Sequence, residues 1–332
     1  MPELLAQISP QRSTQYSNIA SVLAPIELGL SPLGQSPASI ENIKLGRQEY
    51  LKAFISEDAM DEKAVYELGN MAMTNSFFWH YESIGESSGP FLKPINIPDR
   101  HSLPYDLVMT RRYKGKTSEM FTHFLCNVAR YSSSYSADNW SDIRVFDPLA
   151  GGGTTLFTAL YLGAEAAGVE KDSKDVQSTV AFLKQYAKEQ KIPFRFKEER
   201  LKKSIKKYWF TIGTDQQRCI IVNGDTAESA FLISGFKKPH CIVTDLPYGI
   251  QHGGKITELL INALPEWISI LLPGGTIAMS WDSSRFSRME MINLFKDMGP
   301  ISILEGEIYE NMSHRVDRVI KERDVIVARY EE

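Results

Sequence analysis

The chain has 332 residues, of which 43% are hydrophobic and 23% are charged, so it is globular and long enough for one large domain and a smaller one. A net charge of -4 excludes a uniformly basic protein, and any nucleic-acid surface must therefore be local. Three widely spaced cysteines, Cys126, Cys219 and Cys241, exclude a disulfide framework and argue against a zinc site, so we expect no metal. Met1–Thr14 lacks a signal-peptide pattern and no apolar run is long enough to span a membrane, which predicts a cytoplasmic protein without a membrane segment.

Residues 1–110 are predicted to form a mainly helical N-terminal extension with a possible part in substrate recognition. Ile43–Phe54 and Ala64–Met73 have helical spacing of apolar residues, whereas Ser21–Ser39 is rich in Pro, Gly and Ser and predicts an irregular connection. The aromatic run Phe77–Tyr81 follows. It suits stacking on bases or packing against the rest of the protein, and we favour packing.

Residues 111–332 are predicted to form the second domain, which begins with an amphipathic helix. Its apolar residues recur at helical spacing, at Phe121, Phe124, Leu125 and Val128. A helix amino terminus favours anions, so the preceding Lys116, Thr117 and Ser118 are candidates to receive a ligand carboxylate. Ordinary helix capping is the alternative.

A glycine-rich motif, Asp147–Thr155, follows the apolar strand Ile143–Phe146. Its three consecutive glycines, Gly151 to Gly153, permit a sharp turn and close approach of a ligand, while Thr154 and Thr155 are expected to cap the helix that follows. The loop lacks the Lys of a phosphate-binding P-loop and does not match the dinucleotide spacing. The carboxylate of Asp147 would repel a pyrophosphate but suits the cationic amino group of a methionine moiety. We infer a loop that binds S-adenosylmethionine (SAM).

Acidic residues end the next two predicted strands of the sheet. Ala166–Val169 leads to Glu170, and an acidic residue about 20 positions beyond the glycine loop is the usual acceptor for ribose hydroxyls. Cys219–Val222 leads to Asp225, which can accept a hydrogen bond from an adenine amino group. An isolated Glu170 would equally suit a surface carboxylate, but acidic groups after three successive strands favour a shared ligand.

A basic segment, Lys184–Lys207, lies between these strands and holds ten Lys or Arg residues against three Glu. The aromatic residues Tyr208, Trp209 and Phe210 follow directly. The segment suits an arm over nucleic acid, with phosphate contacts and base stacking. A solvated helix whose aromatic neighbours lie in the core is the alternative.

A second motif, Asp245–Gly249, follows the apolar strand Cys241–Thr244. Asp245 and the carbonyl of Pro247 present two acceptors to an exocyclic amine, and Tyr248 suits stacking on the flat base that carries it. When these two acceptors take hydrogen bonds from both N–H groups, they favour the pyramidal form of the amine. Its lone pair is then free to attack a methyl group. The alternative is a plain Pro-containing turn.

The C-terminal part is predicted to close the sheet. Leu271–Thr276 turns into the strand Ile277–Trp281, and Ile301–Tyr309 with Asp324–Tyr330 forms a hairpin that contains the antiparallel last strand. The loop Asn311–Glu322 between them carries His314, Arg315 and Arg318 and is a candidate for substrate contact.

From about Thr117 to Tyr330, the sequence resembles the class I, Rossmann-like SAM-dependent amino-methyltransferases. Their signatures are Asp-Pro-Phe-x-Gly-Ser-Gly-Thr and [Asn/Asp/Ser]-Pro-Pro-[Tyr/Phe], which correspond here to the residues from Asp147 to Thr154 and from Asp245 to Tyr248. The motif order is similar to that of the tRNA guanine-N2 methyltransferases, whereas DNA adenine-N6 methyltransferases with this order generally have Asn first. The sequence departs from the tRNA enzymes because residues 1–110 show no pattern of the THUMP domain that those enzymes usually carry.

The resemblance implies an α/β fold, with a Rossmann-like seven-stranded methyltransferase sheet whose last strand is antiparallel. The residues that it implies for SAM are Lys116, Thr117, Ser118, Asp147, Leu149, Gly151, Gly153, Thr154, Glu170, Lys171, Asp225 and Thr226. Asp245, Pro247 and Tyr248 would hold the target base. Guanine-N2 in RNA is the favoured target, and adenine-N6 or cytosine-N4 in DNA is the second. A protein glutamine amide, an inactive SAM-binding subunit that binds nucleic acid, and a nicotinamide-dependent oxidoreductase remain alternatives, and the oligomeric state is open.

Overall fold

The computed structural model describes residues 3–10, 19–33, 39–55, 59–113, 116–202, 205–247, 253–296, 298–316 and 322–331. The chain forms two compact units. Unit 1 comprises Met1–Arg100 and Glu305–Glu322, and unit 2 comprises His101–Leu304 and Arg323–Glu332. The predicted division near residue 110, and a role of the first part in substrate recognition, stay predictions.

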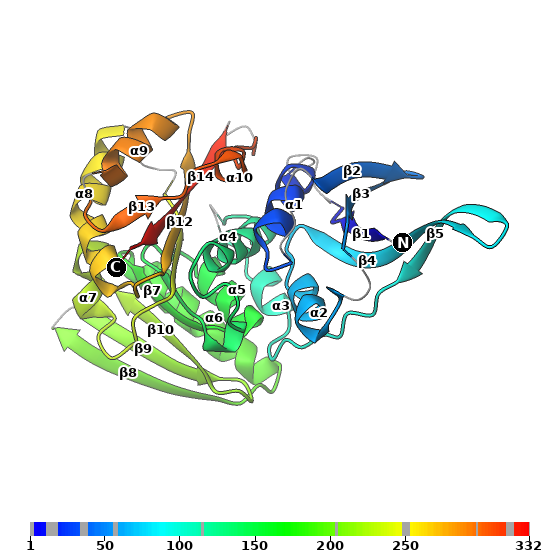
Figure 1. Ribbon diagram of the computed structural model, residues 1–332. Coiled ribbons are helices and arrows are strands. Elements are labelled where there is room, and N and C mark those ends of the chain that lie inside the picture. The colour runs from blue at the N-terminus through cyan, green and yellow to red at the C-terminus, as the bar shows by residue number, and fades with distance from the viewer. Residues whose placement is uncertain are drawn as a thin grey trace. The chain divides into compact units, whose positions relative to one another are not determined.

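Unit 1 is built on a five-stranded antiparallel sheet with the strand order β2-β3-β1-β4-β5 (Figure 1). The strands are β1 (Glu3–Ile8), β2 (Ile40–Leu45), β3 (Gln48–Ala53), β4 (Thr74–Ile84) and β5 (Ser87–Pro94). The helices are α1 (Ile19–Leu30), α2 (Glu62–Gly69) and α10 (Glu307–Glu310). The prediction of a mainly helical extension is therefore wrong.

The error comes from the stretch Ile43–Phe54, which forms a β-hairpin instead of a helix. The turn is two residues long, since Leu45 pairs with Gln48, and Gly46 adopts a φ of 61°. A positive φ at a two-residue turn is typical of hairpins and costs glycine little. Pairing of β3 with β1 then buries Leu51 and Ala53, a long-range contact that helical spacing in one segment does not reveal.

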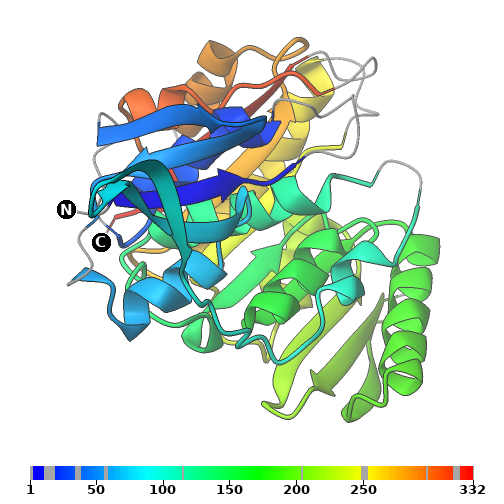
Figure 2. The same ribbon diagram turned by 90° about the vertical axis from the view of Figure 1, so that its right-hand side faces the viewer.

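Helix α1 contacts strands β1, β2 and β3 and packs against this sheet (Figure 2). Its Glu27 is fully buried, and the two carboxylate oxygens accept hydrogen bonds from the backbone N–H groups of Ala72 and Met73 at 2.9 and 2.8 Å. These bonds satisfy two backbone donors just before β4 begins. The segment Ser21–Ser39, predicted as irregular, thus contains most of a helix.

Unit 2 contains a nine-stranded sheet in the described residues, with the order β13-β14-β12-β11-β6-β7-β10-β9-β8. Its strands are β6 (Arg144–Asp147), β7 (Glu165–Glu170), β8 (Phe194–Lys202), β9 (Ile205–Ile212), β10 (Gln217–Asn223), β11 (Cys241–Asp245), β12 (Thr276–Asp282), β13 (Ile301–Ile303) and β14 (Arg323–Tyr330). Strands β10, β7, β6, β11 and β12 are parallel, whereas β14 is antiparallel to β12 and β13 is antiparallel to β14. The predicted Rossmann-like sheet with an antiparallel last strand is confirmed. The described sheet has nine strands instead of the predicted seven, because β8 and β9 extend it, and the strand predicted for Ile301–Tyr309 ends at Ile303.

The five parallel strands follow the order 3-2-1-4-5 along the chain, which places a topological switch point between β6 and β11. In open α/β sheets, ligands bind outside the carboxyl ends of the strands at this point. Both predicted motifs begin at the ends of these two strands. The fold thus brings Asp147 and Asp245 to the same edge of the sheet.

Strands β8 and β9 add a hairpin to the edge formed by β10. The alternative interpretation of Lys184–Lys207 as a solvated helix holds only as far as Glu189, where α6 ends. Beyond it, side chains alternate, so that Phe194 and Phe196 on β8 face Phe210 on β9, while charged residues lie between them. This period of two is the pattern of a strand and not of a helix.

Helices cover both faces of the large sheet. Helices α4, α5 and α6 pack against one face, while α7, α8 and α9 share a buried core with the other face, formed around residues such as Phe146, Ile242 and Trp267. The helical elements of unit 2 are α3 (Asp106–Met109), α4 (Glu119–Tyr131), η4 (Trp140–Asp142), α5 (Thr154–Leu162), α6 (Ser173–Glu189), η5 (Thr226–Glu228), α7 (Ser229–Leu232), α8 (Gly253–Ile270) and α9 (Arg288–Lys296). Among the described residues, none of the helices is long and apolar enough to cross a bilayer.

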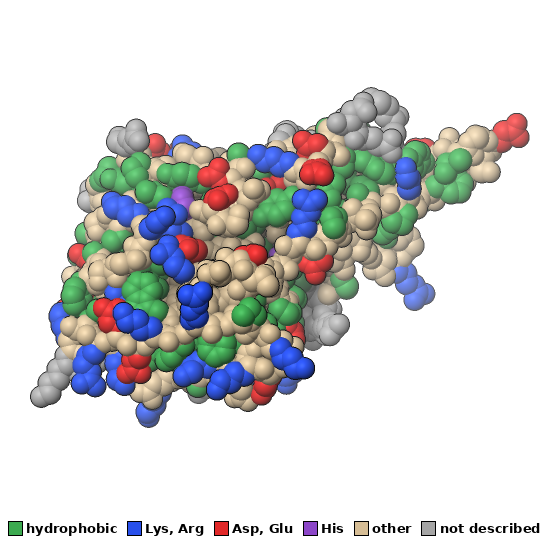
Figure 3. Space-filling view, turned by 90° about the horizontal axis from the view of Figure 1, so that it is seen from below, with side chains coloured by type: hydrophobic (Ala, Val, Ile, Leu, Met, Phe, Trp, Pro, Cys, Tyr) green, Lys and Arg blue, Asp and Glu red, His purple; other side chains and the backbone are tan. Residues whose placement is uncertain are grey.

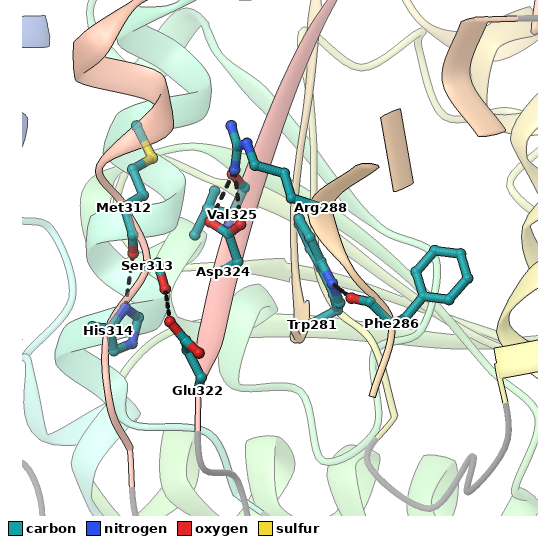
Figure 4. A network of polar contacts seen from close by, with 9 residues as sticks. All are labelled: Trp281, Phe286, Arg288, Met312, Ser313, His314, Glu322, Asp324 and Val325. Carbon is teal, nitrogen blue, oxygen red and sulfur yellow. Dashed lines mark hydrogen bonds and ion pairs between the residues drawn. The ribbon is translucent and has the colours of Figure 1, made fainter. Parts of the chain in front are cut away.

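Polar contacts fasten β14 to α9, and the end of β12 to the segment that precedes α9 (Figure 4). Nη1 of Arg288 on α9 donates to both carboxylate oxygens of Asp324 and to the carbonyl of Val325, each at 2.9 Å. The indole N–H of Trp281 donates to the carbonyl of Phe286 at 2.6 Å. Because Asp324 is buried, its paired charge holds the antiparallel strand in register beside the end of β12.

Candidate cofactor and substrate site

A cavity of about 750 Å³ opens at the carboxyl ends of the parallel strands of unit 2. This volume lies in the range of small-molecule sites, roughly 300–1,000 Å³. The predicted site residues that line it are Thr117, Asp147, Leu149, Gly151, Thr154, Glu170, Lys171, Asp225, Thr226, Asp245 and Pro247. Lys116, Ser118 and Gly153 do not line it, and Tyr248 lies outside the described residues. Both motifs therefore contribute to one cavity.

The glycine loop turns sharply between β6 and α5. Gly151 and Gly153 have φ values of 47° and 86°, a region that side chains disfavour. Gly153 is the N-cap residue of α5 and no side chain caps the helix, so the prediction that Thr154 and Thr155 cap it is wrong. Thr154 and Thr155 instead lie in the first turn and point their hydroxyls at Tyr113 and Asp147. The first backbone N–H groups of α5, which lie beside the cavity, are thus not capped by a side chain.

Asp147 ends β6 at the base of the cavity and is 3% exposed. Burial raises the pKa of this carboxyl to about 6, against the hydrogen bonds from the Thr155 hydroxyl and the Leu149 N–H. The Leu149 bond measures 3.0 Å. A buried carboxylate with a raised pKa gains from a cationic partner, because the partner compensates the lost hydration. Asp147 is therefore suited to an ammonium group.

Glu170 ends β7 and holds the glycine loop against that strand. Its Oε2 accepts from the Gly151 N–H at 2.9 Å, and its Oε1 accepts from the Asp172 N–H at 2.7 Å. The carboxylate is thereby fixed at the cavity wall, one strand away from Asp147. Fixed acceptors in such a position suit hydroxyl donors of a ligand.

Asp225 follows β10 and lies at the rim of the same cavity. Its Oδ2 forms an exposed ion pair with Nζ of Lys171 at 2.9 Å, which together with the Ala227 N–H lowers the pKa of this carboxyl. Thr226 is buried, and its hydroxyl oxygen accepts from the indole N–H of Trp267 at 2.9 Å. Thr226 thus anchors the rim to α8, whereas Asp225 and Lys171 present the polar groups.

Asp245 ends β11, and its carboxylate is oriented by side chains from three other elements. Oδ1 accepts from the hydroxyl of Ser280 on β12 at 2.6 Å, and Oδ2 accepts from the hydroxyl of Thr117 before α4 at 2.6 Å. The guanidinium of Arg323 on β14 lies 3.4 Å from Oδ2. The plane of the carboxylate is therefore set before any substrate arrives.

Arg323 and Tyr113 are site residues that sequence reasoning missed. Arg323 is 2% exposed, and its guanidinium lies over the ring of Phe121 at 4.6 Å. Tyr113 lies against the glycine loop, where its hydroxyl is 2.5 Å from that of Thr154. Tyr113 stood next to the predicted Lys116–Ser118 stretch, but no local signal links Arg323 to Asp245, since 78 positions separate them.

Lys116 faces away from the cavity. Its ammonium group donates to the carbonyls of Val108 and Arg111 at 2.9 and 2.7 Å and pairs with Glu119. Ser118 is the N-cap residue of α4 but makes no side-chain capping bond. Of the three residues expected to receive a carboxylate, only Thr117 lines the cavity, and its hydroxyl is engaged with Asp245.

The predicted substrate loop, Asn311–Glu322, belongs to unit 1, and its residues 317–321, including Arg318, lie outside the described part of the chain. His314 is buried, with Nδ1 3.0 Å from the carbonyl of Met312, and Ser313 donates to Glu322 at 2.8 Å (Figure 4). Substrate contact by this loop stays a prediction.

No family model and no curated protein matches this sequence. Among solved structures, the chain is similar to TrmN from Thermus thermophilus, with 12% identity and a TM-score of 0.46 over 99% of this chain and 100% of that chain. The rRNA methyltransferase aviRa from Streptomyces viridochromogenes has 13% identity and a TM-score of 0.42 over 70% and 96%. A methyltransferase from Pyrococcus furiosus has 12% identity and a TM-score of 0.40 over 67% and 88%. The residues of the cavity, and not these likenesses, carry the function argued below.

Proposed function

We propose that this protein is a SAM-dependent methyltransferase that acts on an exocyclic amine of a nucleic-acid base. One observation carries the proposal. A single cavity brings the glycine loop and its acidic neighbours together with Asp245 and Pro247, at the switch point of a Rossmann-like sheet. Such a transfer requires a cofactor loop together with acceptors for the amine, here Asp245 and the carbonyl of Pro247.

The residues of the cavity fit SAM from one end to the other. Asp147, buried and with a pKa near 6, suits the ammonium group of the methionine moiety. Glu170 suits the ribose hydroxyls, and Asp225 suits the adenine amino group. At Gly151 an added Cβ would meet only the Leu149 carbonyl oxygen, at 4.0 Å, so the loop leaves room there for a ligand to approach the backbone. SAM bound there supplies a methyl group carried on a sulfonium centre.

The protein's own part in the reaction is to hold and orient the amine. Asp245 accepts one N–H, and the carbonyl of Pro247 accepts the other, which favours the pyramidal amine with its lone pair free. Ser280, Thr117 and Arg323 keep the Asp245 carboxylate in place, so that no reorientation is required during the reaction. We include stacking of Tyr248 on the target base in the proposal, and this part rests on the sequence motif alone.

The favoured substrate class is RNA, with guanine-N2 as the target, because Asp245 replaces the Asn that is usual in the DNA enzymes of similar motif order. Adenine-N6 or cytosine-N4 in DNA is the second candidate. A cytoplasmic location belongs to the same proposal.

Ligand-induced stabilisation tests the cofactor assignment. A ligand that binds only the folded state raises the melting temperature by mass action, so SAM and S-adenosylhomocysteine should raise it while NAD should not. Glu170→Ala should reduce the shift, since it removes both a ribose acceptor and the tie to Gly151. Glu189→Ala, an exposed change at the end of α6, is the matched control and should leave it intact. A shift with NAD and none with SAM would reject the proposal.

A further inference from the structure

The β8–β9 hairpin carries a second, shallow cavity on one face of unit 2, of about 380 Å³. We call it the hairpin groove and define it by its lining residues Arg195, Phe196, Lys197, Glu199, Trp209 and Thr211. We propose that the hairpin groove binds single-stranded nucleic acid, with base stacking on Trp209 and phosphate contacts to Arg195 and Lys197. The choice of nucleic acid as the ligand rests on the proposed function.

Strand register places these groups side by side. Arg195 pairs with Thr211 and Lys197 pairs with Trp209, so alternation along the strands puts all four side chains on one face. The opposite face is apolar and covered, because Phe196, Tyr208 and Phe210 pack together there and Lys184 of α6 lies 4.0 Å from the Phe196 ring centre. On the face with Trp209, the indole is half-buried against the core, while Arg195 and Lys197 beside it are exposed.

Trp209 is held as a rigid platform. Its indole N–H donates to Oε2 of Glu199 at 2.8 Å, and the end of its ring packs against Gly235, where an added Cβ would lie 3.2 Å away. Nζ of Lys207 lies 5.4 Å from the ring centre. A fixed aromatic ring stacks on a base with little loss of side-chain entropy, and every base has a face that can stack.

The charges of the groove fit phosphate. Arg195 and Lys197 are exposed, and among the described residues neither has an ion-pair partner. The one carboxylate of the groove, on Glu199, is engaged with the Trp209 indole. By contrast, Lys202 pairs with Glu228, Lys206 pairs with Glu198, and Lys207 is 1% exposed with its ammonium group on the Ser234 carbonyl. Of the described basic residues of the hairpin, Arg195, Lys197 and Arg200 are exposed without an ion-pair partner, and the first two of them lie in the groove.

The face seen in Figure 3 looks onto this end of the large sheet, where Lys and Arg side chains gather with hydrophobic side chains among them. Strand β9 lies four strands from β11, which corresponds to about 19 Å across the sheet. The groove would therefore hold nucleotides that flank the target base, and not the target base itself. This arrangement gives an acidic protein a local surface for a polyanion.

Binding without SAM tests the groove independently of the methyl transfer. Labelled oligo(U) and oligo(dT) are titrated with the full chain, and fluorescence anisotropy is measured between roughly 50 and 200 mM salt. Arg195→Gln with Lys197→Gln should weaken binding and flatten the salt dependence by roughly 0.7 per lost phosphate contact. The control Lys188→Gln with Lys191→Gln removes equal charge from exposed positions outside the groove and should change neither.

Trp209 supplies a second readout. The chain has five tryptophans, and Trp79, Trp140, Trp267 and Trp281 are buried, so quenching of tryptophan fluorescence by oligo(U) should report Trp209. Trp209→Leu keeps an apolar group against Gly235 but should abolish the quenching and weaken the Kd roughly 5- to 150-fold, the range expected for one stacked base. Trp209→Phe should retain most of the affinity.

Three results would overturn the proposal: no binding of either oligonucleotide at low salt, equal losses in the groove and control variants, or Trp209→Leu binding as tightly as the parent while remaining folded by circular dichroism. Such results with intact SAM binding would leave the proposed function standing. Tighter binding of oligo(dT) than of oligo(U) would support the groove and count against RNA as the favoured substrate.

Discussion

Asp147 is a buried carboxyl whose ionisation determines how strongly it attracts a cationic ligand. Its pKa of about 6 means that, below that pH, much of the free protein carries a neutral carboxyl at the cavity base. The folded pKa lies above the ordinary value of 3.8, so the contribution of Asp147 to stability is present below about pH 4 and is lost as the pH rises to 6. Ionisation of the buried Asp147 carboxyl thus destabilises the folded protein, and a bound cationic ligand should offset part of this loss of stability.

We therefore expect the affinity for S-adenosylhomocysteine to increase with pH up to about 6 and then to level off. One linked proton allows at most about a tenfold increase per pH unit. Calorimetric titration from acid to neutral pH measures this dependence. Asp147→Asn should bind more weakly and without the step, because it does not ionise. An equally steep step in Asp147→Asn would assign the titration to another group.

Gly152 determines how closely Tyr113 can approach the glycine loop. An added Cβ at Gly152 would lie 2.2 Å from the Tyr113 ring, so Gly152→Ala must displace that ring. We expect this overpacking to cost about 1–3 kcal/mol of unfolding free energy. Urea denaturation measures it.

A double-mutant cycle assigns that cost. In a Tyr113→Ala background the cost of Gly152→Ala should shrink, with a coupling of about 0.5–3 kcal/mol. Tyr113→Phe keeps the ring and serves as the control that should not relieve the strain. Equal costs of Gly152→Ala in all three backgrounds would contradict this account of the loop.

At the scale of elements, the antiparallel strand β14 depends on a buried charge pair. Arg288 supplies Nη1 to both oxygens of Asp324, whose side chain is 5% exposed. Removing one partner of a fully buried pair costs about 3–5 kcal/mol, because the other charge stays desolvated. Arg288 is 23% exposed, so we expect a smaller cost for Arg288→Ala, about 2 kcal/mol, by chemical denaturation.

Arg285→Ala is the matched control for this prediction. Arg285 pairs with Asp282 but is 40% exposed, and Asp282 retains the bonds from Ser284. We expect that change to cost no more than about 1 kcal/mol. If the loss of unfolding free energy for Arg288→Ala were no larger than for the control, the pair of Arg288 with Asp324 would add no stability to β14.

Elements with a strong local signal were predictable from the sequence. Each parallel strand of unit 2 contains a short apolar run, and three of these strands end in a carboxylate that lines the cavity, at Asp147, Glu170 and Asp245. Unit 1 was not predictable in this way, because β3 is stabilised by pairing with the distant β1 and the alternation along β2 and β3 is weak. The role of Arg323 was not predictable for the same reason, because Arg323 comes close to Asp245 only when the sheet assembles in the order β14-β12-β11.

At the scale of the whole molecule, unit 2 carries both the cofactor cavity and the proposed substrate surface. The Asp245 motif lies at the cavity and the hairpin groove lies four strands away in the same sheet. The net charge of -4 leaves local positive groups to attract a polyanion. One rigid sheet thus carries both the proposed chemistry and the proposed recognition.

Transfer of labelled methyl groups from SAM to separate pools of tRNA, rRNA and DNA would show directly whether the protein methylates a nucleic-acid base. We expect label on an exocyclic base amine, identified by digestion to nucleosides, with RNA labelled in preference to DNA. Asp245→Ala should lower turnover about 100-fold or more while leaving SAM affinity near that of the parent, because it removes an acceptor that acts mainly in the transition state. Full activity of Asp245→Ala, or label on a ring carbon, a ribose hydroxyl or a protein, would contradict the proposed function.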